Sequence, residues 1–200
     1  TVSKLTGLGE ITTNFLLNDM AVYIMNTSAT GSYSSDDWAL LGYTSAEKSI
    51  NHIQERYKRE DKIPRIPTYV KTIRKGLEVK CGLSNQNPMV DALIKQGTYA
   101  TLGATGSEVN HSINESSMEY RAVRFVAELD DGTNYALTIP KAEISQDGEK
   151  TIGGEKEAIT PLMFRAYYNP LALAQGKDLY YESYFTSGIS ATADVPPGYA

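Results

Sequence analysis

The sequence has a single cysteine, Cys81, and no long apolar run. One thiol cannot form an internal disulfide, and it excludes metal sites that are built from several cysteines. No segment approaches the roughly 18 to 20 uninterrupted apolar residues that a bilayer requires, and residues 1–18 lack the basic-then-apolar order of a secretion signal. We therefore expect a soluble chain without membrane insertion, stabilised by its own core or by partner subunits.

Metal-binding histidines and clustered cations are also scarce. The two histidines, His52 and His111, lie far apart in polar stretches, and neither has a carboxylate or a cysteine at ligand spacing. The glycine clusters do not join an apolar strand to a helix, as phosphate-binding loops do. The formal net charge of -5 argues against tight wrapping of nucleic acid, but it is compatible with DNA that slides past. We expect no enzyme activity, no metal and no cofactor.

Tyrosine is the abundant aromatic residue. The chain has 14 Tyr against four Phe and one Trp. A tyrosine ring is apolar and its hydroxyl is polar, which suits surfaces that pair with other subunits. Thr, Ser, Gly and Tyr are spread through most of the sequence, and this composition favours a mainly β fold.

Apolar and polar residues alternate in several segments, which is typical of half-buried strands. Residues 45–59 could form a helix by composition, but Ile50 and Ile53 give too thin an apolar stripe, so we favour a strand. A turn is expected at Gly42, and the DDGT tetrapeptide at 130–133 predicts a tight hairpin turn. The predicted strands are 19–25, 45–59, 69–81, 118–129, 134–144 and 158–168.

Three further features complete the local prediction. In the strand 158–168, the residues expected to face the core are Ile159, Leu162, Phe164 and Ala166. One short helix is predicted at 85–95, where capping residues precede an apolar stripe and Gly97 follows it. The charged, proline-containing segment 58–68 predicts a loop that projects from a long hairpin between strands 45–59 and 69–81.

The order of these elements carries a resemblance. LGYTSAEKSI at 41–50 is followed by the long charged hairpin, one short helix, the DDGT hairpin and ISQDGEKTIGGEKEAITPLMFRAYYNP at 144–170. This order resembles the major tail tube proteins of tailed bacteriophages over about residues 20–168. The strongest matches are LGYTS and the run from IPKAEIS through the GGE turn to a closing P-x-x-F-x-A strand. The motifs do not distinguish a contractile from a non-contractile tail.

The resemblance implies an α+β fold that is mainly β: an antiparallel β-sandwich or small barrel with one flanking helix and a long projecting hairpin loop. It implies a domain at 19–168 between an N-terminal arm at 1–18 and a C-terminal extension at 169–200, whose role it leaves open. It further implies hexameric rings that stack into a hollow tube for phage DNA, in the virion and, during assembly, in the host cytoplasm. The partners implied are other copies of this chain, tail terminator, baseplate or tail-tip proteins, a tape measure protein and DNA bound without sequence preference.

Tube dimensions can be checked by physical reasoning. If each of six subunits gives four strands to an inner wall, about 24 strands at a spacing of about 4.8 Å and a tilt of about 40° enclose a ring about 48 Å across the backbone. Side chains narrow the opening to about 35 to 40 Å, which still admits a DNA duplex. The alternatives are a carbohydrate- or receptor-binding β-sandwich, suggested by the tyrosines and the Trp38 region, a related injection-machine tube, and a hydrolase with a site that the sequence does not reveal.

Three sets of residues are candidates for assembly contacts. The charged loop is expected to dock on the adjacent ring. The polar face of strand 69–81 is expected to line the lumen or to form an intersubunit contact, and the alternative is a merely solvent-exposed outer surface. The apolar residues near both ends are expected to contact neighbouring subunits or, alternatively, to pack on their own sheet. The loop residues are Arg59, Glu60, Asp61, Lys62, Ile63, Pro64 and Arg65, the strand residues are Thr72, Arg74, Glu78 and Lys80, and the terminal residues are Phe15, Leu16, Tyr180, Tyr181, Tyr184 and Phe185.

Overall fold

The fold was examined in a computed structural model, which describes residues 20–25, 38–60, 67–84, 92, 98–102, 106–110, 120–129, 132–149 and 159–185. The strands are β1 (Ala21–Met25), β2 (Trp38–Glu60), β3 (Pro67–Leu83), β4 (Thr98–Leu102), β5 (Gly106–Asn110), β6 (Arg121–Glu128), β7 (Asn134–Gln146), β8 (Thr160–Ala166) and β9 (Tyr181–Phe185), and a 3-10 helix, η2, spans Pro170–Gln175. The fold is therefore mainly β, as the sequence predicts.

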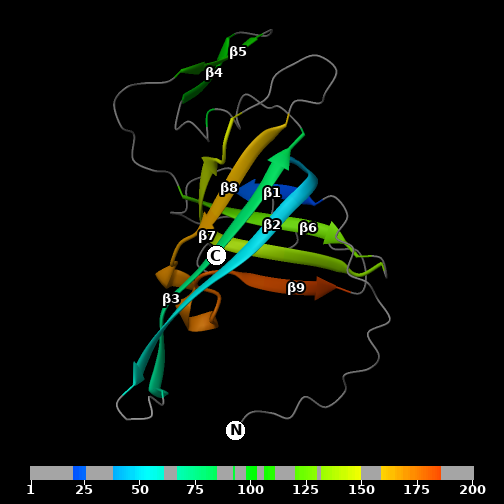
Figure 1. Cartoon of the computed structure of the whole chain (residues 1–200). Helices are drawn as coiled ribbons and strands as arrows, with labels where there is room; N and C mark the ends of the chain where they lie inside the picture. Colours follow the sequence, from blue (N-terminus) through cyan, green and yellow to red (C-terminus); the bar gives the residue numbers. More distant parts are fainter. Residues whose placement is uncertain are drawn as a thin grey trace.

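Six strands close into a barrel. The pairings run in the order β6, β1, β2, β3, β8 and β7, and β7 pairs again with β6. Every pairing in this ring is antiparallel. Figure 1 shows β2, β3 and β8 crossing β6 and the first half of β7 at a steep angle, with β9 beside β7. The hairpin of β4 and β5 forms a separate two-stranded sheet.

The barrel interior is filled by one continuous apolar cluster. The rings of Phe125 on β6 and Phe164 on β8 meet edge to face, with centroids 5.1 Å apart. Both side chains are fully buried, as are Leu77 and Val79 on β3. The alternation predicted for 69–81, 118–129 and 134–144 is thus confirmed, because the odd-numbered apolar residues of these segments that the structure describes face this cluster.

The alternation of the last predicted strand is partly wrong. Leu162, Phe164 and Ala166 are buried as expected, but Ile159 lies just before β8 and is 37% exposed. Its place on the core face is taken by Thr160, which pairs with Leu83. The physical reason is the two-residue period of a strand, which puts 160, 162, 164 and 166 on one face.

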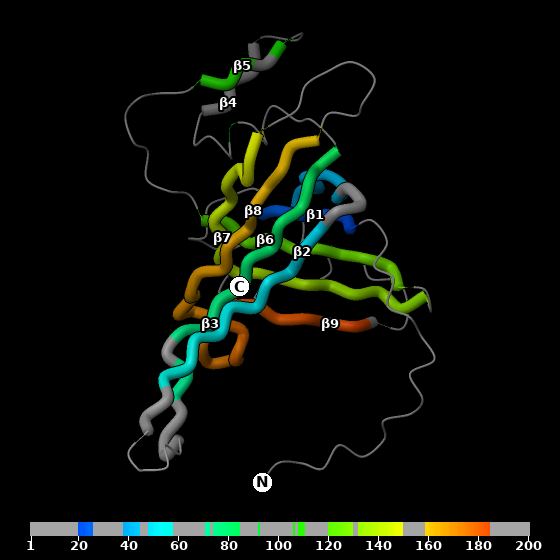
Figure 2. The backbone as a smooth tube through the Cα atoms, viewed as in Figure 1, coloured from blue at the N-terminus to red at the C-terminus, as the bar shows by residue number. Residues whose placement is uncertain are grey.

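The predicted long hairpin is confirmed in β2 and β3. The two strands pair from Thr44 with Leu83 out to Glu60 with Pro67. The turn expected at Gly42 is wrong, because Gly42 lies inside β2 and pairs with Val22 of β1. The helical alternative for 45–59 is excluded because this segment pairs with β3 as a strand. Pairing with β8 covers β3 only from Glu78 to Leu83, so the outer part of the hairpin extends beyond the barrel (Figure 2).

The DDGT turn is also confirmed. Gly132 adopts a left-handed φ of 77°, which glycine tolerates best, and its amide donates to the Leu129 carbonyl at 2.9 Å. The predicted helix at 85–95 lies outside the described residues except for Ala92, which is helical and buried. The strands β4 and β5 were not predicted.

The segment after β8 contains structure that the sequence did not predict. Asn169 caps η2 by accepting a hydrogen bond from the Leu171 amide at 3.1 Å, and Gly176 ends the helix in the left-handed region. β9 then pairs with β7 over Asn134 to Thr138. The first part of the proposed C-terminal extension therefore continues the barrel sheet, while residues 186–200 and the proposed arm at 1–18 lie outside the described residues.

Candidate assembly surface

Four neighbouring strands of the barrel, β2, β3, β8 and β7, share one outward polar surface. We call this surface the polar face. Within the barrel its residues alternate with buried ones, so their side chains point away from the core. The surface continues onto Glu55 and Arg74 of the outer hairpin and onto Asp147 just after β7. Its members are Ser49, Asn51, Glu55, Arg74, Glu78, Lys80, Glu143, Ser145, Asp147, Met163 and Arg165.

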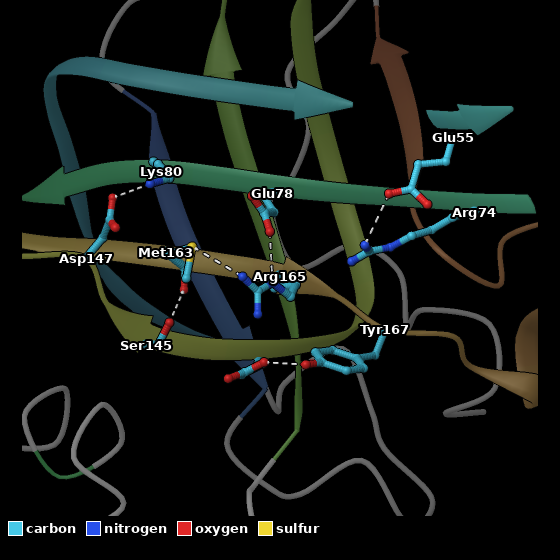
Figure 3. Close-up of polar contacts among 10 residues, drawn as sticks. Glu55, Arg74, Glu78, Lys80, Ser145, Asp147, Met163, Arg165 and Tyr167 are labelled. Atoms are coloured by element: carbon cyan, nitrogen blue, oxygen red, sulfur yellow. Dashed lines mark hydrogen bonds and ion pairs between the residues drawn. The ribbon is translucent and has the colours of Figure 1, made fainter. Parts of the chain in front are cut away.

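One row of the polar face runs straight across the four strands. Asn51 pairs with Glu78, Glu78 with Arg165, and Arg165 with Glu143. The Arg165 Nε donates to Glu78 Oε1 at 2.9 Å, and this hydrogen bond raises the pKa of the Arg165 guanidinium (Figure 3). The Tyr167 hydroxyl donates to Glu143 Oε2 at 2.6 Å, which raises the pKa of the Tyr167 phenol. The row therefore alternates in charge from Glu78 through Arg165 to Glu143, and it ends at the neutral Asn51.

The other charged residues of the polar face are paired as well. Lys80 Nζ lies 2.8 Å from Asp147 Oδ2, and Arg74 Nη1 lies 3.6 Å from Glu55 Oε1 (Figure 3). Pairs this exposed contribute little to stability, at most about 1 kcal/mol each. Their main effect is electrostatic, because each cation has a carboxylate within contact distance.

Three of the four predicted strand residues thus lie on one surface, and Thr72 lies apart from it. Arg74, Glu78 and Lys80 belong to the polar face, and each is in an ion pair. Thr72 is half-buried and pairs with Arg56 next to an irregularity in the ladder, where β3 contains one extra residue. The partners Glu55, Asp147 and Arg165 were not found from the sequence, because they come from other segments of the chain.

The sheet that carries the polar face has two edges that no strand of the described residues covers, and we call these the open edges. Beyond Thr44, β3 is the only described strand that pairs with β2. At the opposite side, β8 is the only described strand that pairs with residues 143–146 of β7. Unpaired edges present free amide and carbonyl groups that can pair with another chain.

Two of the seven predicted loop residues belong to the described part of the chain. Arg59 and Glu60 belong to the backbone ladder of β2, where they pair with Tyr69 and Pro67. The residues outside the described part of the chain are Asp61, Lys62, Ile63, Pro64 and Arg65.

The predicted C-terminal residues lie on the sheet of their own chain. The Tyr180 hydroxyl is 2.9 Å from His52 Nδ1 on β2, and the Tyr181 hydroxyl accepts from Arg124 Nη2 at 3.4 Å. The Tyr184 ring packs against Tyr135 with centroids 5.2 Å apart. These are the contacts of the intramolecular alternative, and whether the same residues also touch a neighbouring subunit stays a prediction.

The remaining terminal candidates are Phe185 and the two residues near the start of the sequence. Phe185 is the last residue of β9, and only its backbone pairing with Asn134 is described. Phe15 and Leu16 lie outside the described residues.

A buried arginine holds part of this arrangement together and was missed from the sequence. The Arg124 guanidinium lies 4.7 Å from the centre of the Trp38 ring, and its Nε donates to Thr138 Oγ1 at 3.0 Å. Arg124 is 3% exposed. A charged residue inside the alternating run 121–128 was the available signal, because it marks an outward position that another element can cover. Trp38 is 6% exposed, so its ring is not presented on the surface.

A cleft of about 340 Å³ opens at one end of the polar face. It is lined by Lys48, Ser49, Lys80, Cys81, Asp147, Pro161 and Leu162. Burial raises the pKa of the Cys81 thiol to about 12, although the nearby Lys48 charge partly opposes this shift. A thiol that stays protonated at neutral pH is a poor nucleophile.

Two observations bear on other chemistry. Among the described residues, no three His, Cys, Asp or Glu side chains gather where they could hold a metal ion. No helix in the described part of the chain is long and apolar enough to cross a membrane.

Comparisons with known proteins find solved structures that are similar to this chain. A crystal structure of an Hcp protein aligns with 83% of this chain and 98% of its own length, at 9% sequence identity and a TM-score of 0.33. A likeness of this extent carries no functional argument. No protein-family model and no curated protein matches the chain.

Proposed function

We propose that this chain is a structural protein that assembles into hexameric rings, and that the rings stack into the hollow tail tube through which a tailed phage passes its DNA. The observation that carries the proposal is the four-stranded sheet of β2, β3, β8 and β7, with its polar face and its two open edges. The resemblance of the sequence to tail tube proteins gives the number of subunits and the cargo.

The two edges suit a ring of identical copies. The four strands alternate in direction, so β2 and β7 run oppositely. When the open edge of β7 meets the open edge of β2 in the next copy, the antiparallel order continues without a break. Such a head-to-tail contact closes a ring when the rotation between copies fits the number of subunits. Closure also removes the exposed edges, which otherwise invite aggregation.

The polar face then becomes the lining of the ring. Six copies contribute about 24 strands and an opening wide enough for a DNA duplex. The ion pairs suit a conduit, because a cation held by a carboxylate is a weaker partner for phosphate. The face opposite the core is the only surface of these strands that can line the opening, because the other face is buried in the barrel.

The projecting hairpin supplies the contact between rings. From Leu77 out to Pro67, β3 has no pairing with β8, a length of about 36 Å at about 3.3 Å per residue. A two-stranded hairpin that leaves its sheet is only marginally stable in water by itself. We therefore propose that its outer part packs on the adjacent ring.

Electron microscopy of the purified full-length chain tests the proposal. We expect rings or long tubes, and deletion of residues 59–65 is expected to abolish tubes while the barrel stays folded. Deletion of residues 106–110, which form β5 of the separate sheet, is the control for loss of a hairpin strand. A full-length protein that stays monomeric at high concentration would contradict the assembly proposal, and long tubes from the 59–65 deletion would contradict the role of the hairpin.

The alternative of a carbohydrate-binding sandwich loses one of its reasons. Lectin-like sites stack sugars on exposed aromatic rings, and the Trp38 ring is covered by the Arg124 guanidinium.

A further inference from the structure

The projecting hairpin leaves the barrel at one rung of the β2–β3 ladder. Asn51 pairs with Glu78, where β3 stops pairing with β8. The next rung outward joins His52 to Leu77, and in the described part of the chain neither residue pairs with a further strand. The direction of the hairpin is therefore set at this pair, which we call the root rung.

The hairpin resists bending less well beyond the root rung. Ile53 pairs with Gly76, and a glycine inside a strand weakens it because it has no side chain to pack. Further out, β3 contains one extra residue between Arg74 and Thr72, and a bulge of this kind bends a strand. A contact at the root rung therefore has a large effect on the direction of the hairpin.

Tyr180 makes such a contact. His52 alternates with Asn51 of the polar face, so its side chain lies on the opposite side of the ladder. There the Tyr180 hydroxyl lies 2.9 Å from His52 Nδ1, and the two rings are tilted with centroids 5.5 Å apart. The Tyr180 side chain also packs against the core cluster. It therefore bridges the hairpin and the end of the barrel, and Figure 1 shows β9 and η2 beside the foot of the hairpin.

Tyr180 is itself held on both sides along the chain. The Asn169 amide donates to the Asp178 carbonyl at 2.7 Å, which closes the loop that contains η2. Directly after Tyr180, Tyr181 pairs with Thr138 as the first residue of β9. A side chain that is anchored in this way can support the hairpin, because its own backbone does not yield.

The length of the hairpin magnifies a small change at the root rung. From Leu77 to Pro67 the outer part measures about 36 Å, so a rotation of about 10° at the root moves the tip by about 6 Å. Side chains are in contact only within about 4 to 4.5 Å, so a shift of this size breaks a packed contact at the tip.

We infer that Tyr180 is a positioning residue for assembly, which holds His52 so that the hairpin leaves the barrel in the direction that the adjacent ring requires. The inference rests on the proposed stacking of rings, and it gives residues 169–181 a role that the resemblance leaves open.

Two variants of the full-length chain separate this contact from the stability of the barrel. Tyr180→Phe keeps the ring and removes the hydroxyl, and His52→Ala removes an exposed side chain. Both are expected to unfold in urea close to the unmodified chain and to form single rings, because the proposed ring contact uses the open edges. The concentration at which tubes appear is expected to rise about tenfold or more, since one hydrogen bond is worth about 2- to 12-fold and every subunit of a ring loses one.

The two substitutions are also expected to act through one contact. Tyr180→Phe should have no further effect once His52 is alanine, because residues that interact are not additive. The matched control is Tyr184→Phe, which removes the hydroxyl of an exposed tyrosine on β9 and should leave tube formation unchanged.

A distance measured on the dilute monomer reports the direction of the hairpin without assembly. In a Cys81→Ala background, which leaves no other thiol, spin labels are attached through Tyr57→Cys on the hairpin and Glu128→Cys at the end of β6. Pulsed EPR then gives the distribution of one distance. Tyr180→Phe is expected to broaden this distribution, and Tyr184→Phe is expected to leave it unchanged.

The outcomes separate this inference from the proposed function. An unchanged distance distribution in Tyr180→Phe, tubes at the unmodified concentration, or additive effects of the two substitutions would overturn the inference while the tube proposal stands. Absence of rings and tubes from the unmodified chain would overturn the proposed function and the assembly role together, and the distance distribution would still decide whether Tyr180 braces the hairpin.

Discussion

Removal of three carboxylates from the polar face is expected to raise its affinity for DNA from negligible to measurable. Glu55, Glu78 and Asp147 lie 3.6, 2.9 and 2.8 Å from the nearest cationic nitrogens of Arg74, Arg165 and Lys80. The triple variant E55Q/E78Q/D147N keeps the shape of these side chains and leaves three cations without their neighbouring negative charge. Two of the pairs are exposed and the third, Arg165 with Glu78, is partly exposed, so the fold is expected to survive the change.

The magnitude follows from counterion release. Each cation that contacts a phosphate contributes about -0.9 to the slope of log affinity against log salt concentration, so three contribute about -2.7. Between about 50 and 200 mM salt, this slope predicts a loss of about 40-fold in affinity. The unmodified chain is expected to show no appreciable binding to a short labelled duplex over the same range.

Fluorescence anisotropy of that duplex at several salt concentrations measures both quantities. The matched control is E108Q/E128Q/E149Q, which removes three exposed carboxylates outside these ion pairs. Both variants change the formal net charge from -5 to -2, so a difference between them reports the position of the charges and not their sum. Equal binding by the two variants would refute the idea that the ion pairs mask the cations, and tight binding by the unmodified chain would refute a passive conduit.

Two further predictions concern the barrel itself. Phe164→Ala should lower the free energy of unfolding by about 3 to 5 kcal/mol, because the ring is fully buried against Phe125. Phe164→Leu should lower it clearly less. Urea denaturation measures both values, and equal effects of the two variants would contradict the packing. Burial raises the Cys81 pKa from 9.0 to about 12, so the unfolded chain loses this proton first and stability should fall as pH rises from about 9 to 12, by at most about 1.4 kcal/mol per pH unit. The Cys81→Ala variant should lack this contribution, and an unchanged slope would show that the thiol is not responsible.

Local pattern in the sequence determined the strands and the faces that they bury. The alternation around Phe125 and around Val79 predicts the core because a strand presents successive side chains to opposite sides, whatever it pairs with. The turn at Gly132 was equally predictable, since a left-handed residue in a short acidic turn is a local property. The same reasoning identified Arg74, Glu78 and Lys80 as one polar surface.

Only the tertiary structure decided which segments meet. The pairing of β3 with β8 brings Glu78 to Arg165, and the end of β7 brings Asp147 to Lys80, although these residues are far apart in sequence. β9 lay in a segment without clear alternation, and it becomes a strand because the edge of β7 offers it hydrogen-bonding partners. Periodicity reports the environment of each face, whereas the identity of the neighbouring strand depends on long-range packing and barrel closure, which no short stretch of sequence contains.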